Sequence, residues 1–304
     1  MTDLESSTSV TLPPAAPPEL AGPGPKVRRR GQRQITEKKL TTLQVRIAQI
    51  ALLAAILAFW QWVPTISAAR KATPVLDPFF ISSPSLIFKT LRELFTGHGE
   101  PSVWSYIWTT LRATIFGCVI GIVTGIAAGL LLSTDLRLRQ VLNPFINAAN
   151  AAPKIALIPI IIIILGPSSE ASVVVSVMIV FFMVFFNAYM GGRSVPPEML
   201  ENARLMGASS WAAMYQIRLR YVLVWTFAAL PNAVTYALLG VVTAEILGGG
   251  QGLGQLIVQA IGQVDANLTF AVVVILSVMG VILVGLTEVM RGRLLHWWPG
   301  GASQ

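Results

Sequence analysis

Six long apolar segments constrain this chain more than any other feature of its sequence. A helix needs about 20 consecutive apolar residues to cross the hydrocarbon core of a bilayer, and each segment is long enough. Only 12% of the residues are charged, about half the share that a soluble domain carries. We therefore predict an all-α integral membrane protein with six transmembrane helices. The predicted spans are residues 46–66, 105–133, 141–165, 171–191, 222–246 and 269–291.

Lysine and arginine residues are distributed unevenly among the connecting segments. If the N-terminus is cytoplasmic, the cytoplasmic segments carry 16 of the 22 lysine and arginine residues, and the outer segments carry four of them. The positive-inside rule then places both termini in the cytoplasm and the chain in the plasma membrane. The net charge of +8 accordingly indicates orientation in a lipid bilayer rather than binding to nucleic acid. We expect a disordered basic tail over 1–45, a six-helix membrane domain over 46–292 and a cytoplasmic tail over 293–304.

Two shorter helices are predicted on the outer side. Residues 84–95 place apolar side chains at helical spacing after Ser83 and Pro84, which favours an amphipathic helix. Residues 252–261 predict a second short helix, re-entrant or interfacial. Each is too short to cross the bilayer as a helix.

The second span carries a glycine at every fourth position. This spacing strips one helix face of side chains, so that a neighbouring backbone can approach closely. The neighbour is either another helix of the same chain or a second subunit. The four residues are Gly117, Gly121, Gly125 and Gly129.

Three further residues are candidates for the pore or its gate. Pro153 interrupts the third span, and irregular backbone at membrane depth usually faces protein or a water-filled cavity. Lys154 would cost roughly 2.5–3.5 kcal/mol at a helix centre, so it either extends to the inner interface or lies near the translocation path. Glu245, at the outer end of the fifth span, is either a solvated interface carboxylate or part of an outer gate.

A cytoplasmic helix–turn–helix is predicted over residues 197–220, between spans four and five. Pro197 can begin the first helix, with Glu198 and Glu201 in its opening turn near the positive end of the helix dipole. Gly207 can end it in the left-handed conformation that glycine adopts cheaply. Ser209 or Ser210 can then cap a second helix that runs into span five.

This loop resembles the loop shared by permease subunits of ABC importers, which reads Glu-Ala-Ala, three residues, Gly, nine residues, Ile-x-Leu-Pro. This loop departs from that pattern at two positions: Asn202 replaces the alanine directly after the glutamate, and Arg220 replaces the proline. The resemblance implies a type I importer permease fold whose coupling helix, between helices 4 and 5, docks on a separate ATPase subunit. The residues that would couple to the ATPase are Leu200, Glu201, Ala203, Gly207, Ile217 and Leu219.

Flanking residues are similar to the nitrate, sulfonate and taurine branch of these importers. They include 82–85, 241–248 and 252–254, whereas residues 161–166 lack that branch's longer aromatic segment. The branch implies a small oxyanion cargo, and it also contains importers of pyrimidine vitamin precursors. The resemblance further implies a homodimer, an extracytoplasmic solute-binding protein and no cofactor of this subunit's own.

The sequence lacks the motifs that nucleotide-binding and metal-binding proteins carry, which limits the alternative functions. The sequence contains no G-x-x-x-x-G-K-[ST] phosphate loop, so we expect a transport subunit that is not itself an enzyme. Its two histidines, His98 and His296, are far apart and indicate no metal site. An ion-coupled secondary transporter is the remaining alternative, although such a protein usually needs more spans and buried ionisable groups.

Overall fold

The computed structural model describes residues 41–62, 78–97, 102–248 and 250–294. The chain divides into two compact units, residues 1–51 and residues 52–304. Most of the predicted N-terminal tail and nearly all of the C-terminal tail lie outside the described residues. Of the first unit, the structure describes Thr41 and the start of helix α1, which runs over Thr42–Trp62 and therefore begins inside the predicted tail.

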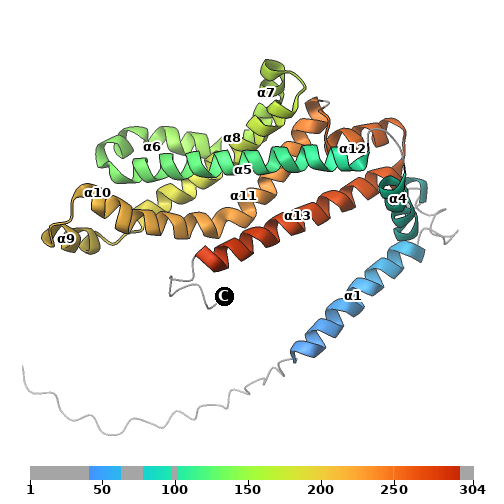
Figure 1. The fold of residues 1–304 in the computed structure, drawn as a ribbon, viewed down its shortest axis with the longest axis horizontal. Helices are drawn as coiled ribbons and strands as arrows, with labels where there is room; N and C mark the ends of the chain where they lie inside the picture. The colour runs from blue at the N-terminus through green and yellow to red at the C-terminus, as the bar shows by residue number, and fades with distance from the viewer. Residues whose placement is uncertain (1–40, 63–77, 98–101, 249, 295–304) are drawn as a thin grey trace, which may run out of the picture. The chain divides into compact units, whose positions relative to one another are not determined.

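All the regular structure in the described residues is helical (Figure 1). Five helices are long and apolar enough to cross a membrane, and a bent pair of helices makes a sixth crossing if it is counted as one span. The long helices are α1, α5 (Val103–Thr134), α8 (Ser169–Arg193), α11 (Leu219–Gly248) and α13 (Ala266–Leu294). The short ones between them are α3 (Pro78–Ile81), α4 (Pro84–Thr96) and α12 (Leu253–Gly262), with α4 and α12 at the predicted positions.

The third predicted span is not one continuous helix. It consists of α6 (Leu136–Ala151), the 3₁₀ turn η3 (Lys154–Leu157) and α7 (Ile158–Leu165), and the two arms are bent by 83°. Proline disfavours helical geometry in the residue before it, and Ala152, which precedes Pro153, is extended with ψ 132°. Pro153 itself has no backbone N–H to continue the helix. The break therefore follows from the local chain.

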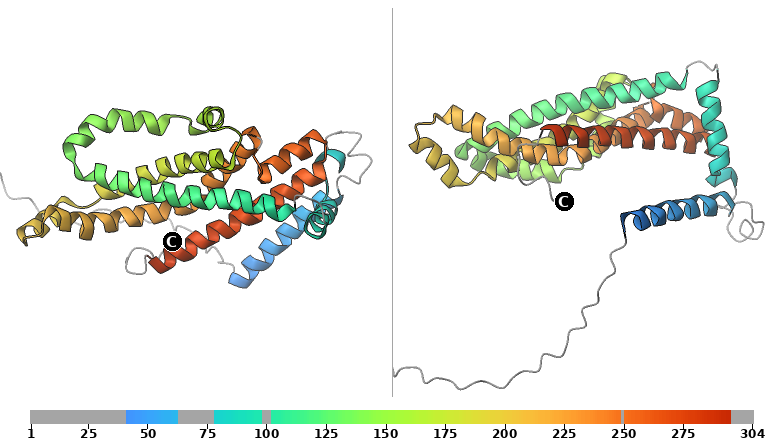
Figure 2. Two further views of the ribbon diagram at one scale, coloured as in Figure 1. Left: turned by 45° about the horizontal axis from the view of Figure 1, so that its top comes forward. Right: turned by 60° about the horizontal axis from the view of Figure 1, so that its bottom comes forward.

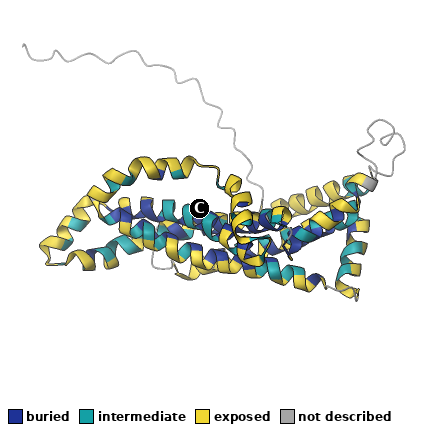
Figure 3. Cartoon of the chain, turned by 90° about the horizontal axis from the view of Figure 1, so that it is seen from above, coloured by how far each residue is buried: buried dark blue, intermediate teal, exposed yellow. Residues whose placement is uncertain are grey.

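The core forms where α5, α8 and α11 pack along one another. Buried residues follow the inner faces of α5, α8, α11 and α13, while their outer faces are exposed (Figure 3). All four glycines of α5 are buried and face α8. A Cβ added at Gly121 would lie 2.8 Å from the Cβ of Val180, and one at Gly129 would lie 2.6 Å from the Cβ of Ala188. Side chains at these positions would push the two helices apart.

Helix α11 connects the two ends of this bundle. The short helices α9 (Pro197–Leu205) and α10 (Ser210–Ala213) lie at its beginning, and α12 lies beyond its last turn (Figures 1 and 2). Between α10 and α11, the five residues Met214–Arg218 form a π-helical turn, η4. Counted together, α10, η4 and α11 form one candidate membrane span of 39 residues, from Ser210 to Gly248.

Candidate functional site

Helix α9 begins and ends as its sequence predicts. Pro197 occupies the first turn together with Glu198, whereas Glu201 falls in the second turn rather than the first. At the other end, the Gly207 N–H donates to the Arg204 carbonyl and the Ala208 N–H donates to the Ala203 carbonyl, each at 2.9 Å. This pair of bonds is a Schellman cap. It gives the loop a single defined shape.

The cap depends on one left-handed residue. Gly207 has φ +83°, and nothing lies within 4 Å of a Cβ added there. A larger side chain would therefore meet no steric obstacle, but it would have to adopt a backbone conformation that costs L-residues roughly 1–2 kcal/mol. The requirement for glycine here comes from the backbone alone.

The second helix of the loop is capped and then leads directly into α11. The Ser209 hydroxyl accepts the N–H of Ala212 at 3.1 Å, which is a typical N-cap bond. Ile217 lies in η4 and Leu219 begins α11, and both side chains are half-buried. The second helix of the loop is thus continuous with the start of α11.

The tip of the loop exposes two large apolar side chains. Leu205 is 86% exposed and Met206 is 88% exposed, while Leu200 and Ala203 are half-buried and Glu201 is exposed. Exposed apolar groups at the tip of a capped, rigid loop are typical of a surface that another protein covers.

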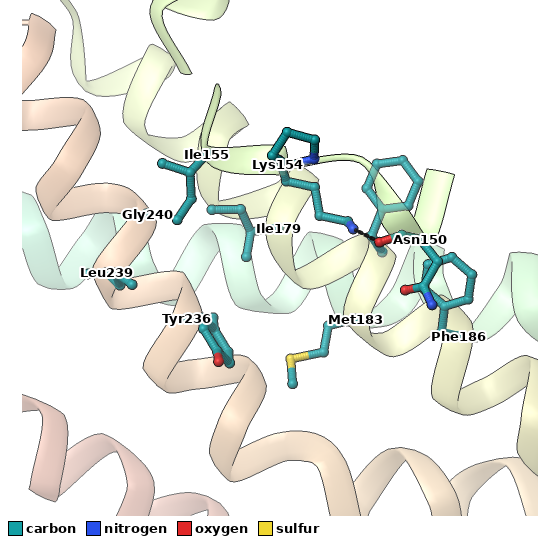
Figure 4. Close-up of a pocket in the computed structure, with 11 residues that line it drawn as sticks. Asn150, Lys154, Ile155, Ile179, Met183, Phe186, Tyr236, Leu239 and Gly240 are labelled. Atoms are coloured by element: carbon teal, nitrogen blue, oxygen red, sulfur yellow. Dashed lines mark hydrogen bonds between the residues drawn. The ribbon is translucent and has the colours of Figure 1, made fainter. Parts of the chain in front are cut away.

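A separate cavity of about 460 Å³ lies among η3, α8 and α11. Both sequence-predicted residues of the broken span, Pro153 and Lys154, line it (Figure 4). Its walls are otherwise mainly apolar and aromatic, and they include Phe182 and Phe186 of α8 and Tyr236 of α11. The broken helix therefore brings one cation into a pocket of aromatic rings.

Lys154 is held by local contacts. Its Nζ donates to the Asn150 carbonyl at 2.9 Å, which Figure 4 shows as a dashed line, and to the Ala152 carbonyl at 3.3 Å. These carbonyls lie at the C-terminal end of α6, where the helix dipole favours a cation. The same Nζ lies 5.5 Å from the centre of the Phe182 ring, a cation–π distance. The ammonium group is thereby fixed at the edge of the pocket.

Glu245 lies apart from both sites. Its side chain is 1% exposed and is enclosed by α5, α11 and α12. Both carboxyl oxygens lie 2.9 Å from the hydroxyl of Thr110, and Oε2 accepts the N–H of Gly254 at 2.9 Å. In this conformation the carboxyl group binds the beginning of α12 and faces neither solvent nor the pocket.

Local patterns in the sequence do not single out Thr110, Phe182 or Tyr236. A partial signal for Thr110 was available, because a carboxyl group buried in an apolar span needs hydrogen-bond donors and Thr110 is one of several hydroxyl residues in the first half of α5. Phe182 and Tyr236 carry no local signal. They line the same pocket as Lys154 because of how α8 and α11 pack beside the break after α6.

Comparisons with known proteins cover most of the membrane domain. The family of binding-protein-dependent transport system inner membrane components matches residues 121–296. The riboflavin permease RibX of Chloroflexus aurantiacus is 30% identical over 160 residues, which are 53% of this chain and 60% of that protein. The formylaminopyrimidine permease ThiX of Halalkalibacterium halodurans is 30% identical over 168 residues, 55% of this chain and 67% of that protein.

A third relative supports the predicted branch. The taurine permease TauC of Escherichia coli is 22% identical over 258 residues, which are 82% of this chain and 88% of that protein. Among solved structures, a chain of the MetNI methionine ABC transporter in an inward-facing conformation superposes with a TM-score of 0.51 at 25% identity. That alignment covers 65% of this chain and 98% of the MetNI chain. The predicted ABC permease fold is therefore confirmed.

Proposed function

Since this chain belongs to the family of inner-membrane components of binding-protein-dependent transport systems, we propose that it forms the translocation path of an ATP-driven importer. In this proposal it is a permease subunit, and a partner subunit hydrolyses the ATP. A solute-binding protein delivers the cargo, and a second copy of the chain completes the pore.

The coupling between α9 and α11 carries this proposal. Helix α9 presents exposed polar side chains such as Glu201 together with the exposed apolar Leu205, a mixed surface on which an ATPase would dock, and its C-terminal end is defined by the Schellman cap. About 26 Å of helix separates the start of α11 from Tyr236 in the pocket. Closure of two ATPase subunits would move α9 and, through α11, the wall of the pocket.

The proposed orientation places α9 in the cytoplasm. The excess of lysine and arginine at that side of the predicted topology supports this direction. The ATPase then binds at the α9 end, and the solute-binding protein binds at the end that carries α4 and α12. Both chain termini lie in the cytoplasm, and the membrane is the plasma membrane.

The cargo proposed first is a small oxyanion of the sulfonate, taurine or nitrate type. Lys154 supplies a fixed positive charge to a pocket whose other walls are mainly apolar. A second candidate is a pyrimidine or flavin-like ring compound. The rings of Phe182, Phe186 and Tyr236 favour it, as does the likeness to RibX and ThiX.

Two substitutions in the loop test the coupling. The chain would be reconstituted with its ATPase and its binding protein, and ATP-driven uptake would be measured in proteoliposomes. We expect Glu201→Ala to lose uptake because it alters the docking surface. We expect Gly207→Val to lose uptake because a β-branched residue resists the left-handed conformation.

Gly207→Asn is the matched control, since asparagine tolerates this conformation and ends helices in the same way. It should retain most of the uptake. Membrane insertion should be similar in all three variants. Thermal stability of the isolated permease should be unchanged in Glu201→Ala and Gly207→Asn, and slightly lower in Gly207→Val because of the left-handed conformation. If Glu201→Ala and Gly207→Val transported normally, the assignment of this loop to ATPase coupling would be wrong.

A further inference from the structure

A second cavity, of about 660 Å³, lies at the α9 end of the spans. Three arginine side chains from three different elements line it: Arg137 of α6, Arg204 of α9 and Arg218 of η4. The last turn of α5 and the first turn of α10 complete the wall, with Thr134 and Trp211. The fold thus brings together guanidinium groups that the sequence separates widely.

The acidic group at this cavity is already engaged. Asp135 is the one carboxylate among the described residues that line it. Its Oδ1 accepts the N–H of Arg137 at 2.8 Å and that of Leu138 at 3.2 Å, as the N-cap of α6. Three guanidinium groups and one carboxylate leave the cavity with an excess of positive charge.

Arg218 is oriented before any ligand arrives. It donates to the carbonyl of Ser133 near the end of α5, and Arg139 donates to the same carbonyl at 3.2 Å. A guanidinium group has five N–H donors, so this contact leaves others for a ligand. Phosphate suits such a group because its oxygens accept two parallel N–H bonds from arginine.

The cavity lies at the ends of two apolar helices that are long enough to cross a membrane. Thr134 ends α5, and Ser210 begins the long apolar helix that continues into α11. Trp211 is 71% exposed, and tryptophan is enriched at the headgroup level of membranes. The anionic groups found at this depth are the phosphates of lipids.

We propose that this cavity binds the phosphate of an anionic phospholipid headgroup. Arg204 and Arg218 make the main contacts to the phosphate, and Arg137 adds to the positive electrostatic potential of the cavity. Because Arg204 belongs to α9, a bound lipid also helps to position the loop that we assign to ATPase coupling. The binding itself does not depend on that assignment or on the cargo.

The test uses the full-length chain purified in detergent. Binding of dioleoyl-phosphatidylglycerol would be titrated by native mass spectrometry, with dioleoyl-phosphatidylcholine as the zwitterionic comparison. We expect the anionic lipid to bind more tightly. Arg204→Gln should weaken it about fivefold, as expected for one basic residue near an anionic surface. The Arg204 side chain makes no hydrogen bond or ion pair in the described structure, and its carbonyl bond to Gly207 is kept in the variant, so Arg204→Gln tests the site without threatening the fold.

Two more variants complete the test. The double variant Arg204→Gln/Arg218→Gln should weaken binding further, on the order of 25-fold if the two contributions add. Arg220→Gln is the matched control, because Arg220 lies two residues from Arg218 but does not line the cavity. Its lipid affinity should stay within a factor of two of the original chain.

Three outcomes would overturn the proposal. The first is equal affinity for phosphatidylglycerol in the original chain and in Arg204→Gln. The second is displacement of the lipid by millimolar inorganic phosphate, which would assign the cavity to a soluble anion. The third is expulsion of the lipid when the ATPase subunit is added, which would assign the cavity to an acidic group of that protein.

Discussion

The hydroxyl of Thr110 on α5 lies 2.9 Å from both carboxyl oxygens of Glu245 on α11, although 135 residues separate them in the chain. The same hydroxyl oxygen accepts the N–H of Leu253 at 2.8 Å, and the carboxyl accepts that of Gly254. These two N–H groups belong to the first turn of α12, which has no side-chain cap of its own. Two side chains therefore join three helices.

Removing the Thr110 hydroxyl should loosen this junction. Thr110→Val keeps the shape of the side chain but leaves the Leu253 N–H without its acceptor and the Glu245 carboxyl without the hydroxyl as a donor. A buried polar group left unpaired costs about 1–3 kcal/mol. We expect a lower thermal unfolding temperature of the purified protein in detergent. Thr109→Val is the matched control, because the Thr109 hydroxyl bonds only within its own helix, to the Ser105 carbonyl. An unchanged unfolding temperature for Thr110→Val would contradict the proposed role of the Thr110 hydroxyl.

A side chain at Gly252 should displace α12. A Cβ added there would overlap the carboxyl group of Glu245, so Gly252→Ala must move either the carboxyl or the helix. We expect faster hydrogen exchange over residues 253–262 and lower thermal stability. Gly262→Ala, at the other end of the same helix, meets nothing within 4 Å and should leave both measurements unchanged.

A bulky residue on the glycine face of α5 should separate α5 from α8. A Cβ at Gly125 would lie 2.9 Å from the Cβ of Val184 and 3.0 Å from the Phe181 carbonyl oxygen. Overpacking of this kind costs about 1–3 kcal/mol even for a few added atoms. Gly125→Leu should reduce the yield of folded protein, measured by size-exclusion chromatography in detergent. Gly285→Leu, in an open position on α13, should leave the yield of folded protein unchanged. Equal yields for the two variants would show that α5 and α8 tolerate separation.

Substitution of Lys154 should distinguish the two kinds of cargo. If the cargo is an anion, Lys154→Gln removes a charge-assisted contact worth about 1.5–3 kcal/mol and should reduce uptake about tenfold or more. Lys154→Arg keeps the positive charge and should retain part of the uptake. If the cargo is a neutral ring compound, Phe182→Ala should have the larger effect. The measurement is uptake of labelled taurine and labelled riboflavin in proteoliposomes. Normal uptake of both compounds by both variants would exclude this pocket from the path.

Most local features could be predicted from the sequence. The boundaries of the long helices follow from the length of each apolar segment, and the limits of α9 follow from Pro197, Gly207 and Ser209. Each of these signals acts within a few residues, through backbone geometry or through the thickness of the bilayer. The third span was the exception, since Pro153 indicated an interruption but nothing in the local sequence indicated a bend of 83° between the two arms.

Apolar length and helix capping are local properties of the chain, so a helical membrane protein with a capped loop before α11 could be inferred from the residues alone. The contacts between distant residues became visible only in the packed fold. It turned the glycine face of α5 toward α8, brought Lys154 beside Phe182, and enclosed Glu245 between Thr110 and the first turn of α12. These contacts join residues far apart in the chain, so they depend on how the helices pack and leave no short-range pattern in the sequence.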